Sequence, residues 1–280
     1  MKSPLVTVIV AAYNEERHIA QCLESLLQQS YSPIEIIVVD DGSTDRTAEV
    51  IREFKSVRLI SQEHLGKATA INRAAAEAQG EIIFFLDGDM FFEKGYVALM
   101  VKPIISGDCI GTAHQDEYVA NQGNTWAACF QAKAGLPADR RLHLTQSQSQ
   151  EGSNVYRAIK KDAFFSVSGF EDTGFLDDQT LYPKLKQKAR FVAGAVCYHY
   201  NPETLGEVFS SGIWGGKSIA HQYGFKAAFS YSPLPALFHA LRIGIETKDV
   251  AMTVYDGTFR LGLFLGLTRS LLSVNKRYGK

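Results

Sequence analysis

The stretch Ile82–Phe92, IIFFLDGDMFF, decides the fold class. Its first five residues are all apolar, which is typical of a strand that is buried on both faces of a parallel sheet. Asp87 and Asp89 follow directly, so two carboxylates stand where this strand ends. Ligands bind beyond the carboxyl ends of the strands in open parallel sheets. The stretch therefore predicts a central strand that leads into a binding site.

The rest of the first hundred residues repeats this pattern. Apolar runs rich in β-branched residues predict further strands at residues 5–13, 34–41 and 57–62. Helical spacing of apolar residues predicts helices at residues 15–29, 43–54 and 66–79, with Ser43 or Thr44 as the N-cap of the second. The polar clusters AAYNEE, DDGSTD and DGDMFF each follow a strand. We expect them to converge at one edge of the sheet.

The second half of the chain is less regular. Residues 114–150 are polar, show little periodicity and end in a Ser/Gln tract, which predicts a partly mobile insertion. Residues 154–170 predict a strand followed by a short helix, residues 176–187 a helix, and residues 189–200 a last strand. From about residue 203 the chain is mostly apolar with helical spacing, so we expect helices there.

Composition excludes several classes of protein. The 280 residues are 46% hydrophobic with a net charge of −1, which is ordinary globular composition and gives no support for nucleic-acid binding. Residues 201–280 carry nine Lys or Arg and five Asp or Glu, a net charge of +4 that favours an anionic surface partner such as lipid. The four cysteines form no CxxC pair, so neither a zinc site nor a redox motif is expected. The N-terminal residues lack the pattern of a signal peptide, and we expect a cytoplasmic protein.

The two aspartates suit a divalent cation. Closely spaced carboxylate oxygens are the ligands that Mg²⁺ or Mn²⁺ prefers, and the phosphates of a substrate often complete the coordination shell. Asp-Gly also favours a simple turn, so the motif by itself does not decide between a metal site and a turn.

Four segments together resemble one family. VTVIVAAYNEERHIAQCLESLLQQSY, EIIVVDDGSTDRTAEVI, GKATAINRAA and GEIIFFLDGD occur in the order and spacing of family 2 glycosyltransferases. The resemblance covers residues 5–95 most strongly and residues 150–200 less so. It implies a GT-A fold, which is α/β with a Rossmann-like, mostly parallel central sheet flanked by helices. It also implies a catalytic domain at 1–202, with a nucleotide-sugar half at 1–113 and an acceptor half at 114–202, before a helical region at 203–280.

The resemblance also assigns the donor site. Its donor-binding positions correspond here to Ala11, Tyr13, Glu15, Asp41, Lys67, Asp87 and Gly88. Asp41 resembles the aspartate that accepts a ring N–H of the base, which suits uracil or guanine. Asp87 and Asp89 resemble the metal ligands, and His199 stands where related enzymes bring a histidine to the metal or diphosphate. Mn²⁺ or Mg²⁺ bound there would stabilise the charge that grows on the leaving nucleotide.

The general base is predicted from the segment SGFEDTGFLDDQTLYPKL. Inverting glycosyl transfer needs a carboxylate that takes the proton of the acceptor hydroxyl. Asp178 precedes the predicted helix where the family places this base, and Asp177 would lie beside the acceptor, in a position where the family usually has Glu. Glu171 and Asp172 are the other acidic pair, at a turn that is usually non-catalytic. An acidic helix start is also favoured by the helix dipole alone.

The C-terminal region carries the acceptor-side predictions. The segment SGIWGGKS keeps Trp214 of the processive QxxRW motif, but Ser210 and Ile213 replace its Gln and Arg, which argues against a cellulose- or hyaluronan-type polymerase. Trp214 and Lys217 are predicted on the acceptor or phosphate side. The apolar segments within residues 231–274 are shorter than the roughly 20 residues of a spanning helix. They predict either peripheral membrane contact on the cytoplasmic face or a packing face, such as that of a homodimer.

The function expected is therefore an inverting, metal-dependent glycosyltransferase. Its donor is a nucleotide-diphosphate sugar, UDP-linked in preference to GDP-linked, and its acceptor is a saccharide or lipid-linked saccharide. Two alternatives remain open: a non-catalytic sugar-nucleotide-binding or scaffold protein, and a sugar-phosphate nucleotidyltransferase. The latter requires a Gly-rich basic loop, and AAYNEERH is not one. A dinucleotide dehydrogenase would need GxGxxG after the first strand, and that motif is absent.

Overall fold

The computed structural model describes residues 3–142, 144–173, 177–223 and 230–278. They form two compact units. Unit 1 contains the chain up to Val119 together with Arg140–Asp172 and Asp177–His199. Unit 2 contains Ala120–Asp139, Thr173 and the described chain from Tyr200 onward. The functional domain boundary at residue 202 stays a prediction.

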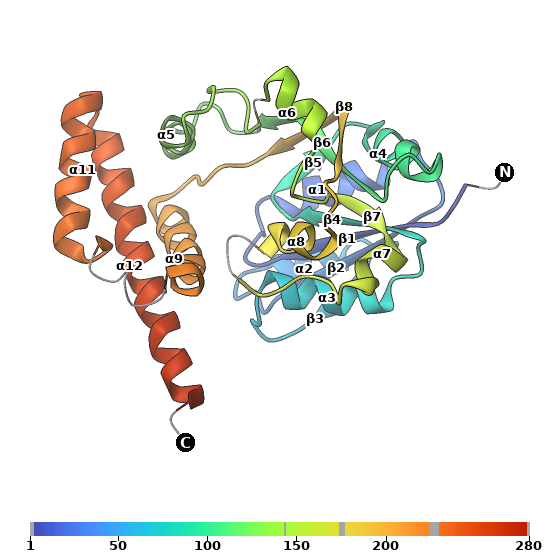
Figure 1. The fold of residues 1–280 in the computed structure, drawn as a ribbon, viewed down its shortest axis with the longest axis horizontal. Helices are drawn as coiled ribbons and strands as arrows, with labels where there is room; N and C mark the ends of the chain where they lie inside the picture. Colours follow the sequence, from blue (N-terminus) through green and yellow to red (C-terminus); the bar gives the residue numbers. More distant parts are fainter. Residues whose placement is uncertain (1–2, 143, 174–176, 224–229, 279–280) are drawn as a thin grey trace. The chain divides into compact units, whose positions relative to one another are not determined.

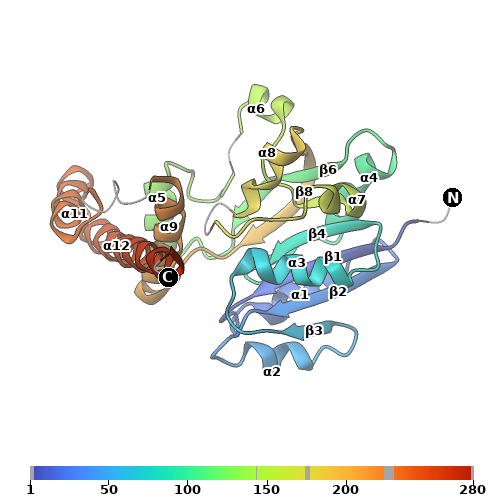
Figure 2. The same ribbon diagram turned by 60° about the horizontal axis from the view of Figure 1, so that its bottom comes forward.

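Unit 1 is built on one eight-stranded sheet with the order β3-β2-β1-β4-β7-β6-β8-β5. Its strands are β1 Val6–Ala12, β2 Ile34–Asp40, β3 Arg58–Ser61, β4 Ile82–Asp87, β5 Met90–Phe92, β6 Gly111–Val119, β7 Ala158–Lys160 and β8 Arg190–His199. The four strands β3-β2-β1-β4 are parallel. Beyond β4, only β6 and β8 run parallel to each other. The predicted α/β fold with a mostly parallel sheet is confirmed (Figures 1 and 2).

Helices cover both faces of this sheet because its central strands are largely apolar and carry apolar side chains on both faces. The helices of unit 1 are α1 Ile19–Leu27, α2 Thr47–Arg52, α3 Lys67–Glu77, α4 Tyr96–Ile105, α6 Gln146–Glu151, α7 Lys161–Ser166 and α8 Leu181–Leu185, preceded by the 3₁₀ turn η1 Asp177–Gln179. On β1, Val8 and its neighbours on the same face pack against α1 and α4. Ile9 points to the opposite face and packs against α3. Each face thus buries a separate apolar core.

Two local predictions are wrong. The segment 114–150 is predicted to be a partly mobile insertion, but it is not an insertion into the fold, because it contains most of β6, an interior strand between β7 and β8, as well as α5 Thr125–Ala134 and α6. His114 and Glu117 of β6 are buried because they bind each other and because Glu117 also binds His199 of β8. The helix α2 is not capped by Ser43 or Thr44, since it begins only at Thr47 after Arg46.

Unit 2 is helical, as predicted for the C-terminal region. It consists of α5, α9 Leu205–Tyr223, α11 Pro233–Thr247 and α12 Val250–Tyr278. The helices α9 and α12 cross with their backbones in contact. A Cβ atom built on Gly216 would lie 2.3 Å from the carbonyl oxygen of Leu263, and one on Gly266 would lie 2.0 Å from that of Ile213. The glycines of SGIWGGKS and LGLFLGL therefore serve close helix packing.

A buried carboxylate ties three of these helices together. The side chain of Asp256, on α12, is fully buried. It accepts hydrogen bonds from Lys133 Nζ on α5 at 2.6 Å, His239 Nδ1 on α11 at 2.9 Å and Arg260 Nε on α12 at 2.7 Å. Burial would raise the pKa of this carboxyl, but Lys133, His239 and Arg260 hold the pKa below its usual value.

The surface of α11 is apolar on one side. Leu234, Leu237, Phe238, Leu241 and Ile245 are exposed and follow helical spacing, whereas Ala236 and Ala240 on the other side are buried. In the part of the chain that the structure describes, no helix combines enough length with enough apolar character to cross a bilayer. The predicted contact of residues 231–274 with a membrane surface or a second subunit stays a prediction.

Candidate active site

The three polar clusters meet at the carboxyl ends of β1, β2 and β4, as predicted. The backbone N–H of Asn14 donates to Ser43 Oγ at 2.9 Å, and the N–H of Thr44 donates to Asn14 Oδ1 at 2.8 Å. The N–H of Gly88 donates to the carbonyl oxygen of Ala11 at 3.2 Å. These bonds join loops that are distant in sequence into one site.

Asp41 organises the loop that precedes α3. Its side chain is only 5% exposed. It accepts hydrogen bonds from Gln62 Nε2 at 2.7 Å, from the N–H of Leu65 at 2.9 Å and from the N–H of Gly66 at 2.9 Å. The ring of His64 lies 3.0 Å from the same carboxylate. The predicted contact of Asp41 with the nucleotide base is not tested by these bonds and stays a prediction.

An aromatic surface lies beside Asp41. The ring of Tyr13 stacks on that of His64, with 4.1 Å between the ring centroids and an interplanar angle of 27°. Tyr13 is 43% exposed, so one side of this stack is accessible. Gln62 Oε1 is buried nearby, and none of the described residues donates a hydrogen bond to it.

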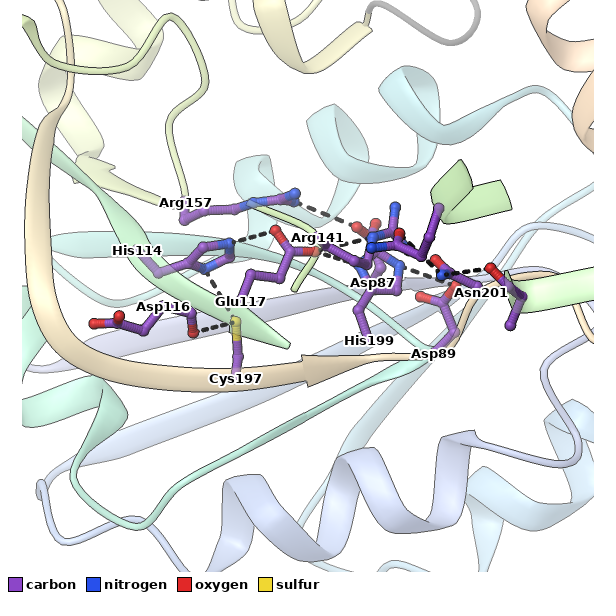
Figure 3. A network of polar contacts seen from close by, with 12 residues as sticks. Asp87, Asp89, His114, Asp116, Glu117, Arg141, Arg157, Cys197, His199 and Asn201 are labelled. Carbon is purple, nitrogen blue, oxygen red and sulfur yellow. Dashed lines mark hydrogen bonds and ion pairs between the residues drawn. The ribbon is translucent and has the colours of Figure 1, made fainter. Parts of the chain in front are cut away.

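Asp87, Asp89 and His199 form a candidate metal site (Figure 3). One potential ligand atom from each lies within 4.8 Å of the other two. Asp87 ends β4, Asp89 precedes β5, and His199 ends β8, where it pairs with Met90. Two carboxylate oxygens and an imidazole nitrogen form a donor set that fits Mn²⁺ or Mg²⁺, with positions left for phosphate oxygens.

A second layer of polar residues supports His199. Glu117 Oε1 lies 2.7 Å from His199 Nδ1, while Asp89 Oδ2 lies 3.2 Å from His199 Nε2. Glu117 Oε2 also lies 3.1 Å from His114 Nε2, and Arg141 Nε lies 3.4 Å from Oε1. Burial would raise the pKa of the Glu117 carboxyl, but hydrogen bonds from His114 and His199 and the charge of Arg141 hold the pKa well below its usual value.

Two cations face Asp87. Lys67 Nζ forms an ion pair with Oδ1, and Arg157 lies 3.3 Å from Oδ2. Burial would raise the pKa of the Asp87 carboxyl, but Lys67, Arg157 and His199 hold the pKa below its usual range. Burial likewise opposes ionisation of Asp89, whose pKa is nevertheless lowered, mainly by His199. Both carboxylates are therefore ionised at neutral pH and available to a cation.

The predicted base lies close to these groups. A narrow hollow is lined by Lys67, Ala68, Ile71, Phe85, Tyr156, Arg157, Phe170, Asp177 and Asp178. Burial lowers the pKa values of Lys67 and Arg157, and the charge of Asp87 raises them. The charge of Asp178 also raises both pKa values, by a smaller amount than Asp87 does. Asp177 is only 3% exposed, whereas Asp178 is half-buried. The structure thus brings Asp178 together with Lys67, while the acceptor role of Asp177 stays a prediction.

Two residues near the candidate metal site were not predicted from the sequence, and two predicted acceptor-side residues lie in unit 2. Sequence reasoning did not find Glu117 or Arg157. The first lies on β6 beyond a bulge between His114 and Asp116, and this bulge allows residues 114 and 117 to contact each other. Trp214 and Lys217 lie on α9, in unit 2, and their acceptor role stays a prediction.

The sequence matches one protein-family model and is similar to several curated glycosyltransferases. The model described as glycosyl transferase family 2 matches residues 7–166. Chondroitin synthase from Escherichia coli is 34% identical over 205 residues, which is 70% of this chain and 29% of that protein. Glycosyltransferase GlyG from Streptococcus pneumoniae serotype 4 is 35% identical over 197 residues, which is 64% of each chain. The chain thus spans less than two thirds of the length of these curated relatives.

Solved structures share the fold. The mannosyltransferase PcManGT from Pyrobaculum calidifontis, in complex with GDP-Man and Mn²⁺, has a TM-score of 0.62 at 20% identity over 97% of this chain and 88% of its own. TarS 1-349 from S. aureus, in complex with UDP-GlcNAc, has a TM-score of 0.56 at 15% identity over 98% of this chain and 92% of its own. Both likenesses support the α/β architecture described above.

Proposed function

The chain belongs to glycosyl transferase family 2 and is a glycosyltransferase, and on this premise we propose that it transfers a sugar with inversion from a nucleotide-diphosphate donor to an acceptor hydroxyl. The observation that carries this proposal is the group Asp87, Asp89 and His199 at the carboxyl ends of the strands, with Lys67 and Arg157 beside it. Such a site can hold a divalent cation and a diphosphate together.

The cations of the chain contribute directly to donor binding. Lys67 and Arg157 lie against Asp87, so their positive charge is available to phosphate oxygens that approach this edge of the sheet. A divalent cation held by Asp87, Asp89 and His199, Mn²⁺ or Mg²⁺, would supply the Lewis acidity that stabilises the departing diphosphate. Mn²⁺ in the PcManGT complex supports this choice of ions.

Asp178 is the proposed general base. It lines the same hollow as Lys67 and Arg157. A half-buried carboxylate can accept the proton of an acceptor hydroxyl as that oxygen attacks the anomeric carbon. Asp177 and the α9 residues Trp214 and Lys217 are proposed on the acceptor side.

The proposed donor base is uracil in preference to guanine. Tyr13 offers a stacking surface, and Asp41 beside it is the proposed acceptor of a ring N–H. The UDP-GlcNAc complex of TarS supports uracil, whereas the GDP-Man complex of PcManGT supports guanine. The loop residues Ala11, Glu15 and Gly88 complete the proposed donor pocket. The proposed acceptor is a saccharide or a lipid-linked saccharide, with the exposed side of α11 in reach of a membrane surface.

Calorimetric titration with UDP and with GDP, with and without Mn²⁺, tests this function. We expect UDP binding that requires Mn²⁺ and is lost in Asp89→Ala. The control is Glu35→Gln, since Glu35 binds Thr7 and the N–H of Gln79 at the start of β2, away from Asp89. Absence of binding of either nucleotide to the folded wild type with Mn²⁺ present would refute the donor site and favour a scaffold role.

A further inference from the structure

Glu117 connects the candidate metal site to the interior of unit 1. It lies on β6 and is 9% exposed. Its two carboxylate oxygens face two different histidines: Oε1 lies 2.7 Å from His199 Nδ1, and Oε2 lies 3.1 Å from His114 Nε2. Arg141 adds a third contact at 3.4 Å. Figure 3 shows these side chains converging from β6, β8 and the segment after residue 139.

The chemistry of the carboxylate fixes where the histidine hydrogens lie. An ionised carboxylate can only accept hydrogen bonds, so each histidine nitrogen that contacts Glu117 carries a hydrogen. His199 therefore donates from Nδ1. Its other nitrogen, Nε2, points to Asp89, at 3.2 Å. By the same rule Nε2 carries a hydrogen when it faces the ionised Asp89, and a cation that binds here displaces this hydrogen to solvent. With Nδ1–H held by Glu117, Nε2 is then the nitrogen that offers its lone pair to a cation shared with Asp89.

Glu117 is itself held in place from behind. Since His114 donates from Nε2, its Nδ1 accepts the hydrogen of the Tyr96 hydroxyl, at 2.9 Å. Tyr96 is fully buried on α4, and His114 is 3% exposed. The resulting chain Tyr96–His114–Glu117–His199 runs from the core to the metal site and leaves Glu117 little freedom to turn.

We propose that Glu117 is a positioning residue for metal binding: it holds the Nδ1–H of His199 and thereby presents Nε2 to the cation. This inference rests on the proposed metal site. Residues that orient metal-bound histidines in this way typically contribute a factor of about 10 to 100 to metal affinity. The same bond also fixes the rotation of the imidazole about its side chain, so that Nε2 stays next to Asp89.

Glu117→Gln gives the sharpest test. Glutamine has nearly the same shape but offers one acceptor and one NH₂ donor in place of two acceptors. Two histidine N–H groups face it, so one histidine must change its tautomer or lose its bond. Where the NH₂ group of the glutamine faces His199, the imidazole hydrogen of His199 moves from Nδ1 to Nε2, and Nε2 then no longer offers a lone pair. We expect Mn²⁺ affinity, measured by calorimetry without nucleotide, to fall by a factor of about 10 to 100.

The control variants separate positioning from general stability. Glu35→Gln changes a glutamate of the same sheet that accepts from Thr7 and Gln79, and it should retain wild-type Mn²⁺ affinity. Glu117→Asp keeps the charge but withdraws it from His199, so its affinity should lie between those of wild type and Glu117→Gln. This variant carries the test if Glu117→Gln does not fold.

The tautomer of His199 provides a second readout. In Mg²⁺-loaded protein labelled with ¹⁵N-histidine, the His199 signal is identified as the one that is missing in His199→Gln. We expect this signal to show a protonated Nδ1 and an unprotonated Nε2. In Glu117→Gln this signal should shift towards protonated Nε2. Equal Mn²⁺ affinity and an unchanged tautomer in a folded Glu117 variant would overturn the inference, while the metal site itself would stand. A wild type that binds no Mn²⁺ would overturn both.

Discussion

Replacing Gly266 with alanine should loosen unit 2. The new Cβ would lie 2.0 Å from the carbonyl oxygen of Ile213, whereas real Cβ contacts essentially never fall under 3.0 Å. The helices α9 and α12 would have to separate by about 1 Å at this point, because the obstacle is backbone rather than a flexible side chain. Overpacking of this kind costs about 3 kcal/mol at the upper end of its usual range. Alanine returns about 1 kcal/mol through its higher helix propensity. The net expectation is a loss of about 2 kcal/mol.

Gly257→Ala is the matched control on the same helix. Its Cβ would meet only Ala240 Cβ, at an ordinary 3.6 Å, so the propensity gain of about 1 kcal/mol should remain. The two variants should thus differ by about 3 kcal/mol in the free energy of unfolding. Urea unfolding followed by far-UV circular dichroism measures this difference, since unit 2 carries long helices. If Gly266→Ala unfolds at the same urea concentration as Gly257→Ala, the backbone contact between α9 and α12 is not as described.

Three further outcomes test the site and the second unit. Asp178→Asn should lower kcat by a factor of about 10² to 10⁴ while UDP and Mn²⁺ binding persist, because only proton removal is lost; loss of nucleotide binding instead would contradict a base role. Tyr13→Ala should weaken UDP binding by about 0.5–1.5 kcal/mol through the lost stacking surface, as measured by calorimetry, and unchanged binding would contradict base contact. Asp256→Asn should destabilise unit 2 by about 3–5 kcal/mol at pH 7, because buried cations lose their partner. The folded-state pKa of Asp256 lies below its unfolded value, so this contribution is complete above the unfolded pKa of about 3.9 and disappears as the pH falls through the folded pKa. The free energies of unfolding of wild type and Asp256→Asn, measured with urea, should therefore converge at low pH. A difference between them that is constant with pH would contradict an ionised Asp256.

The strands β1, β2 and β4 were predictable because the local sequence pattern alone indicates that they are buried. Each contains an unbroken apolar run, at residues 8–12, 36–39 and 82–86, and no distant residue is needed to explain why these runs are buried. The strand β6 could not be found in this way. Its His114 and Glu117 read as surface residues, and they are buried only because Tyr96 and His199 bond to them across the sheet. Local pattern does not record partners that distant in sequence.

The same distinction applies to the site. Asp87 and Asp89 stand at the end of a recognisable strand, so their place at the sheet edge follows from pattern alone. His199 was assigned through family resemblance. Arg157 and Glu117 belong to the site only because β7 pairs with β4 and a bulge interrupts β6. Neither the pairing nor the bulge has a signature in a single sequence.

The pairing of Met90 with His199 affects how the protein is made. Asp89 and His199 are 110 residues apart, so during synthesis the acidic pair leaves the ribosome well before the imidazole. At typical elongation rates this delay is about 5 to 20 seconds. A nascent or prematurely ended chain that lacks β8 has neither His199, the third residue of the candidate metal site, nor the strand with which β5 pairs. If the proposed function holds, only a finished sheet carries the complete candidate metal site, so incomplete chains should bind Mn²⁺ and nucleotide poorly.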